Sequence, residues 1–180
     1  MMSMLGDTST LAPCHPDWKE DNMSKDITKE DVVAKLRDAS WVMMTTATAD
    51  GKLVSHPMVP QEVTEDADIW FFISLTGGHA DALRASSQVN LSVAEAGSWL
   101  SVAADTEFVH DPAKVEELWN KDVEGWFDGK DDPALGLLKV TSESAQFWGL
   151  PGGRMSALAQ IVKSRVAGED TGGQTTTLEL

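Results

Sequence analysis

The segment WVMMTTATADGKLVSHPMV, residues 41–59, decides the fold that the sequence predicts. Two stretches rich in β-branched and apolar residues flank Asp50-Gly51, a dipeptide typical of the tight turn of a β-hairpin. We therefore expect two antiparallel strands, over residues 41–48 and 53–59, joined by this turn.

Four further strands follow from the same kind of pattern. They are expected over residues 68–74, 89–94, 99–109 and 135–148, the last with a bulge around Ser142-Glu143. Hairpin-joined strands with only short helices argue against a doubly wound parallel sheet. The sequence instead favours a mainly β (α+β) fold, a closed or partly closed antiparallel barrel of six strands with helices at its ends.

Four helices are expected around these strands. The first covers residues 28–39, where Thr28 and Asp31 resemble a capping box, and the second covers residues 79–86. A third helix begins at Asp111-Pro112, an N-cap followed by proline at the first helical position. A C-terminal helix over residues 153–166 is predicted from apolar residues at helical spacing. In the third helix, three apolar residues are expected to be buried: Val115, Leu118 and Trp119.

The chain is expected to form one domain, over residues 27–167. Residues 1–26 are polar and broken by Pro13 and Pro16, so we predict a disordered arm. Residues 168–180, GEDTGGQTTTLEL, are predicted to be a disordered tail.

The net charge of the chain limits the classes of partner that it can bind. Its 180 residues carry a formal net charge of −15, and a field of that sign repels nucleic-acid phosphates and anionic membranes. We expect neither nucleic acid nor membrane as a partner. The start of the chain lacks the basic and apolar regions of a signal peptide, so a cytoplasmic location is expected.

The sequence contains no recognisable catalytic or metal-binding motif. The single cysteine, Cys14, excludes a cysteine cluster, and the four histidines have no metal-binding spacing, so no metal site is expected. The motifs of serine hydrolases, P-loops and dinucleotide folds are missing from the sequence. No catalytic side chain is therefore assigned.

Two stretches resemble a known family. The first is TADGKLVSHPM (residues 48–58), followed by IWFFIS (69–74) and QVNLSV (88–93). The second, and more specific, is LWNKDVEGWFDGKDDPALGLLKVTSESAQFW (118–148). Together they resemble the pyridoxamine 5′-phosphate oxidase-like split barrels, in particular the general stress protein branch, over roughly residues 27–150.

The resemblance implies a homodimer with two flavin sites at the subunit interface and an FMN-dependent oxidoreductase activity. FAD, a deazaflavin or no cofactor are the alternatives for the ligand. The FMN phosphate is expected near the second strand and the start of the short helix, and the ring over the second and third strands. Aromatic residues of the acidic loop and last strand would close the site from the partner subunit. The implied cofactor-binding residues are Ser55, His56, Pro57, Met58, Val59, Phe72, Ile73, Ser74, Gly78, His79, Trp126 and Trp148.

The chain departs from the family pattern at the phosphate. Family members typically have Arg at the position of His56, Ser and Lys at the positions of Gly77 and His79, and Thr at the position of Ile73. Imidazoles could replace the cations if the phosphate raises their pKa. Two alternatives therefore stay open: a non-catalytic stress-response dimer with weak or lost flavin binding, and a carrier of heme or another ligand.

Overall fold

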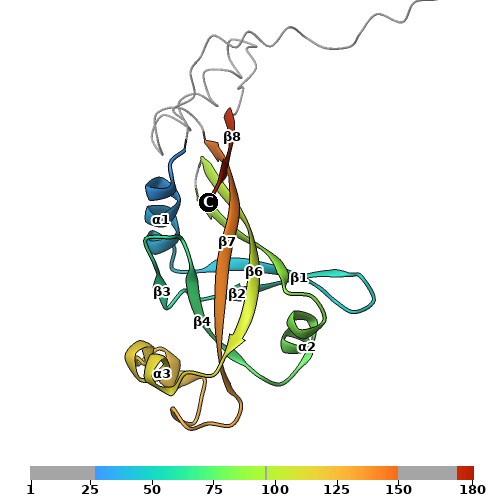
Figure 1. Cartoon of the computed structure of the whole chain (residues 1–180), viewed down its shortest axis with the longest axis vertical. Helices are drawn as coiled ribbons and strands as arrows, with labels where there is room; N and C mark the ends of the chain where they lie inside the picture. The colour runs from blue at the N-terminus through green and yellow to red at the C-terminus, as the bar shows by residue number, and fades with distance from the viewer. Residues whose placement is uncertain (1–26, 96, 150–173) are drawn as a thin grey trace, which may run out of the picture.

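The computed structural model describes residues 27–95, 97–149 and 174–180. In these residues, eight antiparallel strands form one open sheet with three α-helices around it (Figure 1). The strand order is β2-β1-β5-β6-β7-β4-β3, and β8 also pairs with β7. The elements are α1 (Lys29–Asp38), β1 (Val42–Ala47), β2 (Leu53–Met58), β3 (Glu62–Val63), β4 (Ile69–Ser74), α2 (Gly78–Ala85), β5 (Gln88–Glu95), β6 (Ser98–Val109), α3 (Pro112–Leu118), the 3₁₀ turn η1 (Val123–Gly125), β7 (Leu135–Gly149) and β8 (Gln174–Glu179).

The predicted mainly β, antiparallel architecture is confirmed, and the sheet is open, as in a split barrel. The hairpin predicted around Asp50-Gly51 is β1 and β2, paired from Val42 opposite Met58 to Ala47 opposite Leu53. Gly51 has φ of +81°, a conformation that glycine adopts without the steric cost of a Cβ atom. The dipeptide therefore fixes the register of the whole hairpin.

The predicted strand number, six, is wrong, because β3 and β8 were missed. β3 has only two residues, too few for an alternating pattern to be visible. β8 lies in the tail that was predicted to be disordered, and its residues 174–179 pair with residues 144–149 of β7. Its threonines have a high β propensity, and this preference outweighs their polarity when an unpaired strand edge is available.

The long strand β7 organises the core. It pairs with β6 along one edge, and with β4 and then β8 along the other. Ala103 of β6 faces Ser144 and Ala104 faces Ser142, so Glu143 is an extra residue and the predicted bulge is confirmed. The largest fully buried side chains come from both sides of this strand and from α1: Phe71, Leu36, Met44, Ile69, Leu91 and Leu138.

The caps of α1 and α3 are as predicted. Thr28 and Asp31 form both hydrogen bonds of a capping box, and the Asp111 carboxylate accepts the backbone N–H of Lys114. Val115, Leu118 and Trp119 were predicted to be buried, but each is only partly buried. Helix α3 lies at one end of the sheet, not across its core, so only part of its surface is covered (Figure 1). The predicted arm (residues 1–26) and C-terminal helix (153–166) lie outside the described residues.

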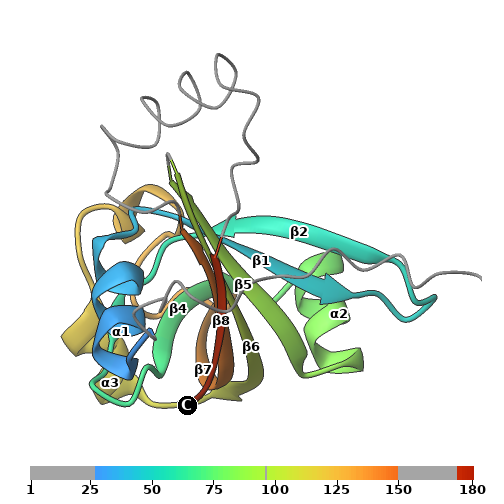
Figure 2. The ribbon, with the colours of Figure 1, turned by 90° about the horizontal axis from the view of Figure 1, so that it is seen from above.

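The two ends of the strand order define the open side of the sheet. β2 stands at one end and β4 with β3 at the other, and in the described residues β2 pairs only with β1 (Figure 2). The sheet curls, so residues from both ends line the same cavity. No helix in the described part of the chain is long and apolar enough to cross a lipid bilayer.

Candidate functional site

A cavity of about 320 Å³ lies between the two ends of the sheet. The β2 end contributes to one wall, β4 to another, and the acidic loop between α3 and β7 closes the remaining side. Its lining residues are Trp41, Pro57, Val59, Gln61, Phe72, Ile73, Ser74, Asp122, Val123, Trp126, Phe127, Asp132 and Ala134.

The alternation of β4 aims its side chains at the cavity. Ile69, Phe71 and Ile73 are buried in the core, whereas Phe72 lies on the opposite face of the strand. The Phe72 ring meets the ring of Trp119 edge to face, with centroids 6.0 Å apart. This aromatic contact joins the β4 wall to the segment that follows α3.

Asn120 holds the acidic loop over the cavity. Its amide donates a hydrogen bond of 2.7 Å to the Gln61 side chain, and its Oδ1 accepts the backbone N–H groups of Asp122 and Val123. The chain then turns through η1 and presents Trp126, whose side chain is 76% exposed. An indole this exposed in a cavity wall is available to stack on a ligand.

The cavity wall carries negative charge. Asp132 accepts hydrogen bonds from the backbone N–H groups of Asp128 and Ala134, which hold the pKa of its carboxyl below the usual value. Asp132 is therefore ionised at neutral pH. Asp122 adds a second carboxylate from the same loop.

A pair of stacked histidines lies on the other face of β2. Because side chains alternate along a strand, His56 points away from the face that carries Pro57. Its ring stacks on His79 of α2, with centroids 4.0 Å apart and an interplanar angle of 13°. In the described part of the molecule, the buried atoms His56 Nδ1 and His79 Nε2 have no hydrogen-bond partner.

The pair is poorly suited to carry charge by itself. Burial and, to a smaller extent, the neighbouring His56 together lower the pKa of His79 to about 4. His79 is therefore neutral at pH 7 unless an anion binds next to it.

The start of α2 is open to a ligand. Gly77 is the N-cap, with φ of +95°, and no side chain caps this helix end. Among the described residues, no atom lies within 4 Å of the place that a Cβ of Gly77 or Gly78 would occupy. Just before it, the hydroxyls of Ser74 and Thr76 are 3.0 Å apart. Unpaired N–H groups at a helix start favour an anion.

The structure brings most of the predicted site residues into two groups. Six line the cavity, and three belong to the His56–His79 pair and the start of α2. The remaining three lie apart. The Ser55 hydroxyl contacts that of Thr45 at 2.8 Å, Met58 is in the core, and Trp148 lies opposite Trp99 in the sheet. The six cavity residues are Pro57, Val59, Phe72, Ile73, Ser74 and Trp126.

Sequence reasoning missed seven of the lining residues. Five of them belong to the acidic loop, whose aromatic residues and aspartates are a signal, but a loop has no period that tells which side chains turn inward. Trp126 was expected to act from a partner subunit, yet it already lines the cavity of its own subunit. The missed residues are Trp41, Gln61, Asp122, Val123, Phe127, Asp132 and Ala134.

An open antiparallel barrel with a cavity at its split side defines the class of this protein as a split barrel. The family model described as "Pyridoxamine 5'-phosphate oxidase like" matches residues 28–172. The chain therefore belongs to the pyridoxamine 5′-phosphate oxidase-like family, as the resemblance implied. No match was found among curated proteins.

Solved structures agree on the fold. A candidate general stress protein 26 from Jannaschia sp. CCS1 is similar with a TM-score of 0.65 and 24% identity, covering 84% of this chain and 97% of that one. A protein related to general stress protein 26 from Clostridium acetobutylicum also has a TM-score of 0.65, at 16% identity, covering 86% and 97%. The general stress FMN/FAD binding protein from Xanthomonas citri has a TM-score of 0.58 and 28% identity, covering 67% and 87%.

The pKa of His79 predicts how stability depends on pH. The pKa is about 4 in the folded state and 6.5 in the unfolded state, so the unfolded chain binds more protons between these values. The stability contributed by neutral His79 is fully present above pH 6.5 and is lost as the pH falls towards 4. Urea denaturation at several pH values measures the free energy of unfolding. As the pH falls, this free energy should decrease less in His79→Asn than in the wild type. His110→Asn, at an exposed histidine, is the control. An equal decrease in the free energy of unfolding in all three proteins would contradict the lowered pKa of His79.

Proposed function

We propose that this protein is a flavin-dependent oxidoreductase of the general stress protein type, with FMN held beside a homodimer interface. One observation supports this most strongly: an aromatic cavity lies next to an uncapped helix start and two imidazoles with unpartnered nitrogens. The FMN/FAD binding relative from Xanthomonas citri adds support. FMN supplies the electron-transfer chemistry when it is bound, so no acid–base pair is required of the chain.

The phosphate of FMN fits the group formed by His56, His79 and the start of α2. A buried phosphate requires charge-assisted donors, and a protonated imidazole provides them. β2 is an edge strand, so a ligand that passes round its free edge reaches His56 on one face and Pro57 on the other. The backbone N–H groups after Gly77 add donors to the same site.

The ring of FMN fits the cavity walls. Phe72 and Trp126 offer aromatic surface, and Ser74 and Gln61 offer polar atoms for a ring edge. Oxidised flavin carries no charge on its ring, so the ring does not require a cation in the cavity. The flavin alternatives, FAD and a deazaflavin, share the phosphate and the flat ring.

The chemistry of the histidine pair favours a second candidate. His56 and His79 stand where the family pattern has two permanent cations, and His79 is neutral at pH 7, which weakens the attraction for phosphate. A stress-response dimer with weak or no flavin binding is therefore the alternative. The FMN titrations below separate it from the first proposal.

Part of the outward face of the sheet is uncharged, and this part supports the homodimer. In the described strands β1, β2 and β5, and in β6 and β7 over residues 99–103 and 144–148, no outward-facing residue is charged, in a chain with a net charge of −15. Asp105 and Glu143 border this uncharged face near Gln88. The face includes the exposed side chains of Met43 and Trp99. An exposed face that lacks charge and carries aromatic residues is typical of a protein interface. The residues are Met43, Thr45, Ala47, Leu53, Ser55, Pro57, Gln88, Asn90, Ser92, Ala94, Trp99, Ser101, Ala103, Ser144, Gln146 and Trp148.

FMN should bind more tightly at lower pH. Phosphate raises the pKa of the imidazoles that contact it, so binding takes up protons, and affinity falls as the pH rises from about 4 towards the pKa in the complex. Calorimetric titration of FMN between about pH 5.5 and about pH 8 measures this trend. Riboflavin, which lacks the phosphate, is the control and should show no such trend. No binding of FMN at any pH in this range would establish the second candidate instead.

His56→Arg should strengthen FMN binding at pH 8. A permanent cation replaces an imidazole at the phosphate, and a charge-assisted hydrogen bond is worth about 1.5–3 kcal/mol, or at least about tenfold in Kd. His110→Arg makes the same change of charge at an exposed residue and should leave the Kd unchanged. Equal affinity of His56→Arg and wild type would contradict the placement of the phosphate.

Trp99→Glu should give a monomer. The substitution places a charge at the uncharged face, where burial in an interface would leave it unpaired. Analytical ultracentrifugation of wild type and variant measures the mass in solution. His110→Glu, just beyond the end of β6, is the matched control and should remain dimeric. A wild-type monomer, or a Trp99→Glu dimer of unchanged stability, would exclude this interface.

A further inference from the structure

The cavity combines aromatic walls with carboxylates. Among the described residues that line it, the charged groups are Asp122 and Asp132, and none is Lys, Arg or His. Trp41 and Trp126 are both more than half exposed, at 54% and 76%. Aromatic faces and carboxylates are the groups that attract an organic cation, and they repel an anion.

Two of the three lysines between Asp111 and Asp132 are paired with carboxylates. Lys130 forms an ion pair with Glu116 at 2.6 Å. Lys114 forms ion pairs with Glu62 and Glu117, and its ammonium also lies over the ring of Trp70. Neither of these lysines, nor the exposed Lys121 beside Asp122, lines the cavity, so the charged groups of its wall are carboxylates.

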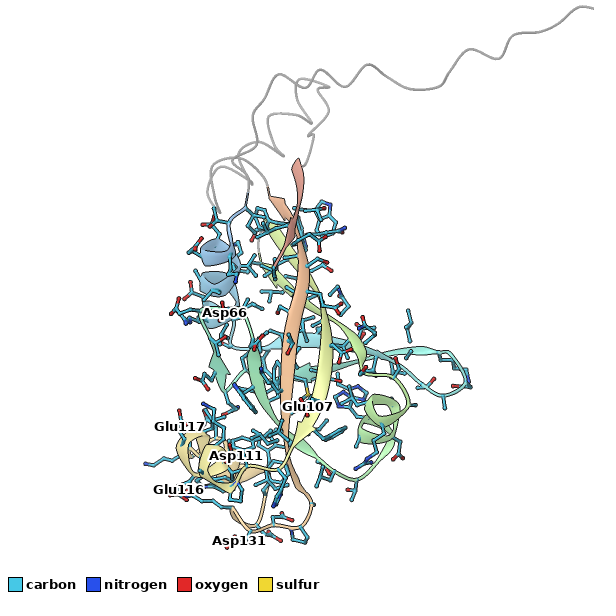
Figure 3. All side chains as sticks on the ribbon, in the orientation of Figure 1. Asp66, Glu107, Asp111, Glu116, Glu117 and Asp131 are labelled. Carbon is cyan, nitrogen blue, oxygen red and sulfur yellow. The ribbon has the colours of Figure 1, made fainter. Side chains whose placement is uncertain are left out.

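The surroundings stay negative although Glu116 and Glu117 are paired with lysines, because residues 111–132 contain eight Asp and Glu against three Lys. Figure 3 shows Asp111, Glu116, Glu117 and Asp131 together at the end of the molecule that α3 and the acidic loop form. Asp122 and Asp132 belong to the same loop. Charges of one sign around a concave wall add up and select ligands by their charge.

We propose that the cavity selects a planar aromatic ligand that carries no negative charge, and that it prefers a cationic one. Its role as the substrate of a bound flavin rests on the function proposed above; the charge preference itself does not. The phosphate ester in the family name, pyridoxamine 5′-phosphate, is the opposite class of ligand. A second phosphate in this cavity would meet two carboxylates and no cation from the described lining.

Two dyes of similar shape and opposite charge test the proposal. Equilibrium dialysis of the flavin-free full-length protein against N-methylphenazinium, a planar cation, should show one site per chain. The Kd for anthraquinone-2-sulfonate, a planar anion, should be at least about tenfold higher. Equal affinity for the two dyes, or tighter binding of the anion, would overturn the proposal.

A pair of loop variants separates the cavity from the general acidity of the chain. Asp122→Asn should raise the Kd of the cation by about threefold or more, because a lining charge is lost. Asp131→Asn removes the same charge from the same loop but outside the cavity, and the Kd should not change. Equal effects of the two substitutions would show that the cation binds by net charge alone, and the proposal would fail.

The outcome of the FMN titrations is independent of the outcome of the dye measurements. If FMN does not bind, the dye measurements on the flavin-free protein still test the charge preference of the cavity. If FMN binds as proposed and the dyes show no preference, the flavin function stands and only the ligand class is wrong.

Discussion

The arrangement depends on one strand that pairs along both edges. β7 holds β6 on one side and, on the other, β4 along its first half and β8 along its second. The pairing with β4 turns Phe72 and Ser74 outward, because Phe71 and Ile73 must fill the core. The sheet therefore ends in β4 and β3 on one side and in β2 on the other. The cavity exists because these two ends approach each other without pairing in the described residues.

An unpaired edge usually invites aggregation, and here the molecule uses it for a site. β2 carries Pro57, which has no N–H group for pairing with a further strand. At the cavity, this edge is therefore protected against pairing with another chain. The same strand presents different chemistry on its two faces: an apolar ring at Pro57 and an imidazole at His56. A ligand with a flat end and an anionic end matches this division. The edge strand β2 therefore contributes to both parts of the candidate site, with Pro57 at the cavity and His56 in the histidine pair.

The sequence predicted the elements that have strong local signals. Asp50-Gly51, the capping box of Thr28 and the N-cap Asp111 are local, and each was found where expected. β8 was missed because its stability comes from pairing with β7, which its own polar residues do not reveal. At the site, strand residues such as Phe72 and Ser74 were predictable from alternation and family resemblance. Asp122, Phe127 and Asp132 were not, because the hydrogen bonds of Asn120 and Asp132 decide which loop residues face inward.

The distribution of charge gives the two parts of the site different selectivity. In a chain with a net charge of −15, long-range attraction does not bring a phosphate to the surface, so an anion must be held by local donors. The His56–His79 pair meets this requirement only when it takes up a proton, since His79 is neutral at pH 7 on its own. The cavity beside it keeps the Asp132 carboxylate ionised, because backbone N–H groups lower the pKa of that carboxyl. A ligand that satisfies both parts is anionic at one end and uncharged or cationic at the other, and its binding is coupled to pH through the histidines.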